Sequence, residues 1–369
     1  MRKILLFIFL FYYAAIISAQ SPCNDEAIMS MKGGWKKKSD ANMNGGKDIT
    51  EINKRLDNIS ELFKSAYPEP KGNEAGWYRT MSDNSIMSNG PVAYNFNSLY
   101  QHWYCNVHLK KMLLSDETGT WAFVYVNHYG WFMSSQYDML NIKVDGNPVY
   151  TLPIKKGIWK NYTLYRTSSG GEKSNCIILS RNGQVPWKPV SQQQYLEATL
   201  VQLKDQRMKT SDGYTIQENN LRKSMADTKN NKNLKDADKE KMIVFFQKQL
   251  DDMEKTKDEH IGRMNKGWDD KINAIENYMK QTDAATLQGP AIIDHHVIDD
   301  FKGKFPTEEQ GGRMLVTADP GYFNTKLPHA APQFIVLLWT WDNIAPGLDF
   351  KKQFEDNFPV EKLQAMLDK

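Results

Sequence analysis

The side chains best suited to hold a metal ion occur together in one short segment. Asp294, His295 and His296 are consecutive, and Asp299 follows three residues later. On a helix His295 and Asp299 would share one face, whereas on a strand Asp294 and His296 would share one side. Either arrangement supplies two ligands, although zinc sites in proteins use three or four. The segment is therefore a candidate metal site, and a solvated linker is the alternative interpretation.

Aromatic side chains form a second candidate site, because they are dense between residues 94 and 137. Exposed Trp and Tyr rings suit flat ligands with apolar faces, such as sugar rings. The run Trp121–Val126 alternates like a strand, so its aromatic residues share one face and are predicted to belong to the core. The candidate ligand-binding residues are three aromatic residues near predicted turns: Tyr129, Trp131 and Tyr137.

Three cysteines allow one disulfide bond and one free thiol in an oxidising compartment. Cys105 and Cys176 both lie in the strand-rich part of the chain, so they are the predicted disulfide, with a buried reduced pair as the alternative. Cys105 is also three residues from His102 and from His108, within residues 97–114, which are predicted to be helical. A shared helix face would let the thiol and an imidazole act as nucleophile and base. A disulfide at Cys105 would remove that use.

Several motifs that mark enzyme families are missing from the sequence. It contains no HExxH, no G-x-S-x-G, no P-loop and no GxGxxG, which argues against an orthodox metalloprotease, lipase or nucleotide enzyme. The formal net charge is +3, and nucleic-acid binding needs a strongly basic surface. We therefore expect no nucleic-acid partner, no cofactor and a non-catalytic role.

The start of the chain has the order of a secretory signal peptide. Arg2 and Lys3 precede an apolar run over residues 4–17, and Ser18 and Ala19 supply small residues for cleavage. This run is shorter than the roughly 18–20 residues that span a bilayer. We therefore expect residues 1–19 to be removed by cleavage after Ala19, and the mature chain to be secreted or periplasmic without a transmembrane segment.

Periodicity divides the rest of the chain into four segments. Residues 20–48 are polar and rich in Gly, Lys and Asn, which predicts a flexible arm. Residues 49–190 combine helical periodicity with alternating strands and tight turns, which predicts a mixed α+β domain. Residues 191–286 lack strand formers, and strands return in residues 287–369. Two strands alone make a poor sheet, so this last segment is expected to pack on the domain of residues 49–190.

Residues 191–286 are predicted to form a long charged helical hairpin. Apolar residues recur at steps of three and four over residues 237–281, and the Asn-rich stretch 229–233 suits the turn. The second helix has a stronger apolar stripe than the first helix can cover. It is therefore expected to bind a protein partner or to self-associate, and a self-contained hairpin is the alternative.

Together these patterns predict an α+β protein with an antiparallel sheet domain that the C-terminal segment completes. A long charged helical hairpin, similar to a coiled coil, is inserted into that domain. The predicted function is that of an exported, non-catalytic binding or scaffolding protein of the cell envelope. The alternatives are a secreted hydrolase with the His/Asp metal site and a carbohydrate-binding protein that uses exposed aromatic residues.

Overall fold

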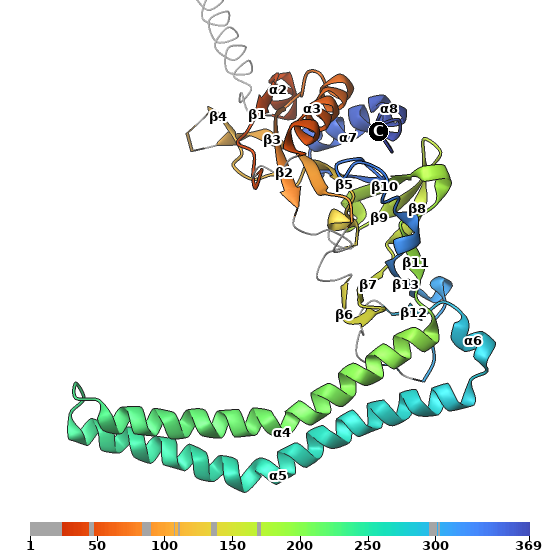
Figure 1. The fold of residues 1–369 in the computed structure, drawn as a ribbon. Helices are drawn as coiled ribbons and strands as arrows, with labels where there is room; N and C mark the ends of the chain where they lie inside the picture. The colour runs from red at the N-terminus through yellow and green to blue at the C-terminus, as the bar shows by residue number, and fades with distance from the viewer. Residues whose placement is uncertain are drawn as a thin grey trace, which may run out of the picture. The chain divides into compact units, whose positions relative to one another are not determined.

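The computed structural model describes residues 24–43, 48–82, 90–106, 108–109, 111–133, 139–167, 171–294, 301 and 303–369 (Figure 1). The chain divides into two compact units that are interleaved in sequence. The bounds of the first unit are Met1–Met139, Leu152–Lys188 and Ala318–Lys369, and those of the second are Leu140–Thr151 and Pro189–Thr317. The predicted C-terminal segment is therefore shared between the two units.

Nine strands form the main sheet of the described chain: β1 (Trp35–Lys37), β2 (Asn73–Ser82), β3 (Ala93–Asn106), β4 (Lys111–Leu114), β5 (Trp121–Val126), β8 (Ile154–Trp159), β9 (Tyr162–Arg166), β10 (Ser174–Ser180) and β14 (Phe334–Thr340). Their order is β1-β2-β3-β5-β14-β10-β9-β8, and β4 pairs with β3. β1 and β2 are parallel, and the pairs from β2 to β8 are antiparallel. The predicted α+β class is confirmed, and the C-terminal strand β14 completes the sheet at its centre.

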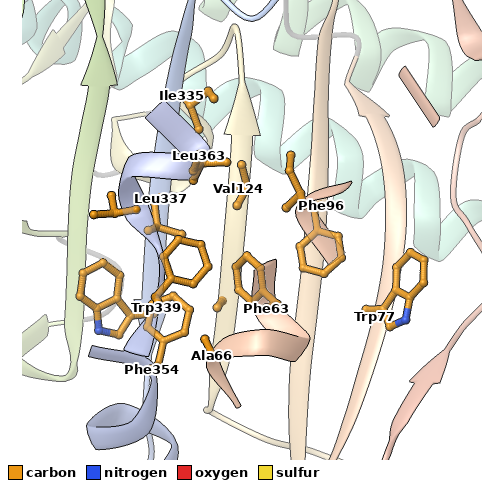
Figure 2. Packing of buried hydrophobic residues seen from close by; sticks show 14 of the residues in the cluster. Phe63, Ala66, Trp77, Phe96, Val124, Ile335, Leu337, Trp339, Phe354 and Leu363 are labelled. Atoms are coloured by element: carbon orange, nitrogen blue, oxygen red, sulfur yellow. The ribbon is translucent and has the colours of Figure 1, made fainter. Parts of the chain in front are cut away.

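One face of this sheet is covered by α3 (Ile49–Ala66), α7 (Ala345–Asn357) and α8 (Val360–Gln364). Figure 2 shows Phe63 of α3 and Phe354 of α7 among the side chains of the strands. The ring centroids of Phe63 and Phe96 are 4.8 Å apart, and those of Phe354 and Trp339 are 5.4 Å apart. The apolar residues of α3 recur at steps of three and four, which places them on one face: Ile52, Leu56, Ile59 and Phe63. This layer is the main hydrophobic core.

The helix predicted over residues 97–114 is wrong, because β3 and β4 occupy this stretch. The first eight residues of β3 are all buried. Tyr94 to Asn97 alternate between apolar and polar residues, but from Asn97 onward apolar residues come in adjacent pairs, so the alternation that indicates a half-buried strand is missing from the stretch assigned to a helix. His102 and Cys105 are three residues apart, so they point to opposite sides of the strand, and His108 lies in the following turn. The predicted shared face of these three residues does not form.

The predicted disulfide between Cys105 and Cys176 is also wrong. Cys105 is disulfide-bonded, whereas Cys176 is a free and fully buried thiol. β5 and β14 separate β3, which carries Cys105, from β10, which carries Cys176. Strands are spaced about 4.8 Å apart, so β3 and β10 are about 14 Å apart, far beyond the roughly 7 Å Cα separation that a disulfide tolerates. Burial raises the pKa of the Cys176 thiol, which stays protonated.

The described part of residues 20–48, the predicted flexible arm, has regular structure. It contains α2 (Asp25–Ser30) and β1. Near the end of this segment, Asp40 forms an ion pair with Arg79 of β2. Nη2 and Nε of Arg79 donate to Oδ2 of Asp40 at 2.7 and 2.9 Å. Burial by itself raises the pKa of Asp40, but the hydrogen bonds from Arg79 outweigh it and lower this pKa overall. The stability that this pair contributes is therefore present above pH 3.8, the ordinary pKa, and is lost as the pH falls further.

A second, five-stranded sheet contains β6 (Met139–Val144), β7 (Asn147–Thr151), β11 (Trp187–Pro189), β12 (Ile292–Ile293) and β13 (Arg313–Ala318). The order is β11-β13-β7-β6, and β12 also pairs with β13. β7 and β13 are antiparallel, with Val316 opposite Tyr150. The second unit thus combines a small sheet with the long helices.

The long helices are α4 (Gln192–Asn230) and α5 (Asp236–Gln281), and the short α6 (Ala284–Gln288) follows them. They form the helical hairpin predicted for residues 191–286 (Figure 1). Buried apolar residues join the helices near the base of the hairpin, and ion pairs flank them: Lys204 with Glu276 at 2.8 Å and Arg207 with Asp269 at 2.6 Å. In the part of the chain that the structure describes, no helix is long and apolar enough to cross a membrane.

Both long helices bend along their length in Figure 1. Gly213 lies inside α4 and Gly262 inside α5. The hydroxyl of Tyr214 and Nδ1 of His260 are hydrogen-bonded at 3.0 Å, so the two glycines lie at the same level of the hairpin. Glycine inside a helix costs about 1 kcal/mol relative to alanine. Both helices therefore lose helix propensity at this level of the hairpin.

We expect Gly213→Ala and Gly262→Ala each to stabilise the protein by up to about 1 kcal/mol. A Cβ at either position has no heavy atom within 4 Å, so the substitution raises helix propensity without a clash. Thermal unfolding followed by circular dichroism measures the effect. Gly119→Ala is the control, because its Cβ would meet Oδ1 of Asp342 at 2.3 Å and should destabilise. Lower stability of the hairpin variants would contradict the prediction.

Candidate functional site

The face of the main sheet opposite the helices carries a ladder of aromatic rings. Trp121, Phe123 and Tyr125 alternate along β5, while the intervening Ala122 and Val124 belong to the core under the helices. Neighbouring rings of the ladder have centroids 5.6 Å apart and planes inclined by 6° and 8°. The shared face predicted for the three aromatic residues forms. Phe123 and Tyr125 are buried, but Trp121 at the end of the ladder is partly exposed.

A short 3₁₀ helix, η1 (Gly130–Phe132), lies over this ladder. The ring of Trp131 packs on Phe123 with a centroid separation of 4.8 Å and remains 48% exposed. Gly130 has a φ of +52° and lies directly on Tyr125, so that a Cβ there would be 2.3 Å from ring atoms. Only glycine permits both this backbone conformation and this contact. The glycine thus sets the height of Trp131 above the sheet.

The turn between β5 and η1 is held by Asn127, which has a φ of +60°. Its Nδ2 donates to the carbonyls of Val92 and Ala331, both at 3.0 Å. Its Oδ1 accepts a hydrogen bond from the backbone N–H of Gln333 at 2.7 Å. Three hydrogen bonds to two other segments, at Val92 and at residues 331–333, therefore fix the backbone that leads to Trp131.

His128 follows in the same turn and is buried as a neutral side chain. Its ring centroid lies 5.0 Å from that of Tyr125, with the planes at 75°. Burial lowers the pKa of His128 to about 4, although a hydrogen bond with the backbone of Tyr94 acts in the opposite direction. Its Nε2 is buried and has no hydrogen-bond partner among the described residues. The hydrogen bond with the backbone of Tyr94 does not offset the cost of burying a positive charge on the imidazole.

A hollow of about 290 Å³ opens beside the exposed end of the ladder. We call it the tryptophan hollow. Two partly exposed tryptophans line it together with four side chains that can form hydrogen bonds: Trp121, Trp131, Thr167, Lys173, Thr340 and Asp342. A third tryptophan, Trp341, also contributes, but its ring is covered by Nζ of Lys156 at 5.3 Å and of Lys351 at 4.6 Å. The rings open to a ligand are therefore those of Trp121 and Trp131.

The carboxylate of Asp342 has a fixed position in the tryptophan hollow. Its Oδ2 accepts a hydrogen bond from the backbone N–H of Gly119 at 2.8 Å, and its own N–H donates to Oγ1 of Thr120 at 3.0 Å. None of the described hydrogen bonds uses its Oδ1. Lys173, by contrast, is exposed at the same hollow. The hollow thus offers a fixed acceptor, Asp342, and an exposed cationic donor, Lys173.

A second, more open hollow of about 610 Å³ adjoins the first. The two share Gly119, Lys173 and Asp342, and the second adds His102 and Glu117. The tryptophan hollow is therefore one end of a longer polar groove, with the aromatic rings confined to that end. A ligand with one ring and a polar extension matches this distribution.

The three aromatic residues predicted to bind ligand differ in their positions. Trp131 lines the tryptophan hollow. Tyr129 is buried, and its hydroxyl donates to the carbonyl of Pro186 at 3.0 Å, so it supports η1 rather than contacting solvent. Tyr137 lies outside the described residues.

The metal site predicted at Asp294, His295, His296 and Asp299 stays a prediction. Asp294 is exposed, and the other three residues lie outside the described ranges. Within those ranges no three His, Cys, Asp or Glu side chains are placed to hold a metal ion.

Sequence reasoning missed most residues of the tryptophan hollow. Trp121 was predicted as core, and Thr167, Lys173 and Asp342 carry no local signal because they come from separate segments. Comparisons of the chain with protein-family models, with curated proteins and with solved structures find no match.

Proposed function

We propose that the protein is an exported, non-catalytic binding protein of the cell envelope, and that its ligand is a carbohydrate. A sugar ring presents an apolar face of C–H groups and a polar edge of hydroxyls. In the tryptophan hollow, Trp121 and Trp131 suit the apolar face, and Lys173 and Asp342 suit the hydroxyls. The exposed ring of Trp131, held over the sheet beside hydrogen-bonding groups, is the observation that carries the proposal.

Two further observations support a binding role. Asp342 accepts a hydrogen bond from a backbone N–H and is therefore preorganised as an acceptor. The tight turn at Asn127 and Gly130 fixes the backbone between the aromatic ladder of β5 and Trp131. The proposal of export is supported by the signal-peptide pattern of residues 1–19.

We expect Trp131→Ala to weaken sugar binding by at least about tenfold, because a central aromatic contact in an interface is typically worth more than 1 kcal/mol. Calorimetric titration with a panel of neutral oligosaccharides of glucose, galactose and N-acetylglucosamine measures this. Quenching or a shift of tryptophan fluorescence provides a second readout.

Tyr104→Ala is the matched control, because Tyr104 is 37% exposed and belongs to the same sheet but does not line the hollow. Its affinity for the sugar should equal that of the wild type. If no member of the panel binds, or if Trp131→Ala and Tyr104→Ala bind equally well, the carbohydrate proposal fails.

A further inference from the structure

The start of α5 contains five consecutive apolar residues, Met242 to Phe246. A helix that packs on one partner buries one face, so five residues in a row cannot all be covered by α4. Leu250 is buried, and Ile243 and Phe246 are partly buried on the same side of α5. The remaining apolar residues of the run must face outward.

Two of these residues are strongly exposed: Val244 is 63% and Phe245 is 56% exposed. Lys241 precedes Val244 by three residues, and Lys248 follows Phe245 by three, so all four side chains share the outer face of α5. Both lysines are exposed, and no described ion pair contains either of them. We call this surface the tip face: Lys241, Val244, Phe245 and Lys248.

The surroundings of the tip face are basic. Residues 229–248 contain six lysines and three acidic residues, so the local formal charge is +6 − 3 = +3. Some cations of the hairpin are paired locally, such as Lys209 with Asp205 at 2.7 Å and, within this stretch, Lys239 with Asp236 at 3.2 Å. The end of the hairpin therefore combines exposed apolar side chains with an excess of positive charge.

We propose that the tip face docks on a lipid bilayer whose headgroups are anionic. Val244 and Phe245 would enter the boundary between headgroups and acyl chains, while the lysine stems extend along the apolar region and place their ammonium groups at the phosphates. The positive charge of the tip is complementary to that surface. A protein partner would instead need a rim that excludes water around the two apolar side chains, and the outside of a helix provides none.

The test is co-sedimentation of the full chain with vesicles of phosphatidylcholine alone and of phosphatidylcholine mixed with phosphatidylglycerol. The wild type should bind the mixed vesicles and be released by salt. The double variant Val244→Ser/Phe245→Ser should bind at least about tenfold more weakly, because two apolar side chains no longer leave water. Lys241→Gln/Lys248→Gln should lose the preference for phosphatidylglycerol.

The matched control is Val201→Ser/Met208→Ser on α4, where both side chains are also strongly exposed, at 71% and 65%, but outside the basic tip. This variant should bind vesicles like the wild type, and circular dichroism should show unchanged helix content in all variants. The proposal is overturned if the wild type does not bind the mixed vesicles. It is also overturned if the serine variants of the tip face bind equally well, or if the tip only joins two copies of the chain in crosslinking.

Discussion

Lowering the pH from 7 to 5 is expected to cost the protein about 2 kcal/mol of stability through a single side chain, His128. The pKa of the buried imidazole is about 4, whereas an unfolded histidine titrates near 6.5. Above pH 6.5 the side chain is neutral in both states, so its contribution is complete. Between pH 6.5 and 4 the unfolded state binds a proton that the folded state does not, and stability falls by about 1.4 kcal/mol per pH unit.

Urea unfolding at a series of pH values measures this loss, which should reach roughly 3 kcal/mol at pH 4. His128→Phe is the informative variant, because it removes the titrating group and keeps an aromatic ring against Tyr125. Its stability should be nearly independent of pH in this window. The carboxylate of Asp40 cannot imitate the effect, since it titrates below pH 3.8. A wild type and a His128→Phe variant with parallel pH profiles would refute the prediction.

Gly130→Ala is expected to destabilise the protein by about 2–5 kcal/mol and to abolish the proposed sugar binding. The left-handed backbone at this position costs alanine about 1–2 kcal/mol. The added Cβ would also lie 2.3 Å from the ring of Tyr125, and such overpacking adds about 1–3 kcal/mol. Relief of the clash requires η1 to move away from the sheet, which displaces Trp131 from the tryptophan hollow.

Gly183→Ala separates the cost of the left-handed backbone from the cost of the clash with Tyr125. Gly183 has a φ of +71°, similar to that of Gly130, but a Cβ there meets nothing within 4 Å. This variant should lose only about 1–2 kcal/mol and should keep its affinity for the sugar. Denaturant unfolding and sugar titration of both variants make the comparison. Equal losses of stability in the two variants would show that contact with Tyr125 is not important.

The sequence predicted best those elements whose signal is local. The helical hairpin was found almost to the residue, because α5 repeats apolar residues at helical spacing along most of its length and the Asn-rich stretch 229–233 marks the turn. β3 was mistaken for a helix because apolar residues come in adjacent pairs over residues 97–106, which removes the alternation that marks a strand. Pairing with β2 and β5 on either side makes this stretch extended, and the pattern within the stretch does not reveal that pairing.

The tryptophan hollow was found only in part for a related reason. Trp131 could be selected because it lies near a turn. Its suitability as a binding residue, however, depends on Phe123, on which it packs, and on Asp342, which lines the same hollow. Asp342 lies two residues after the end of β14. Because β14 pairs directly with β5, this places Asp342 near Trp121 of β5. No local pattern around Asp342 predicts this pairing, so the site becomes visible only when the order of the strands is known.

The central position of β14 also constrains when the protein can fold during synthesis. β5 and β10 do not pair with each other, because β14 lies between them. The ribosome makes β14 about 150 residues after β10. The edges of β5 and β10 therefore stay unpaired until residue 340 has been synthesised. The hairpin of α4 and α5 can form earlier, because its contacts are closer in sequence. During this interval the unpaired edges of β5 and β10 are exposed to aggregation, so a chaperone that holds the chain until its C-terminal strand arrives should raise the yield of folded protein.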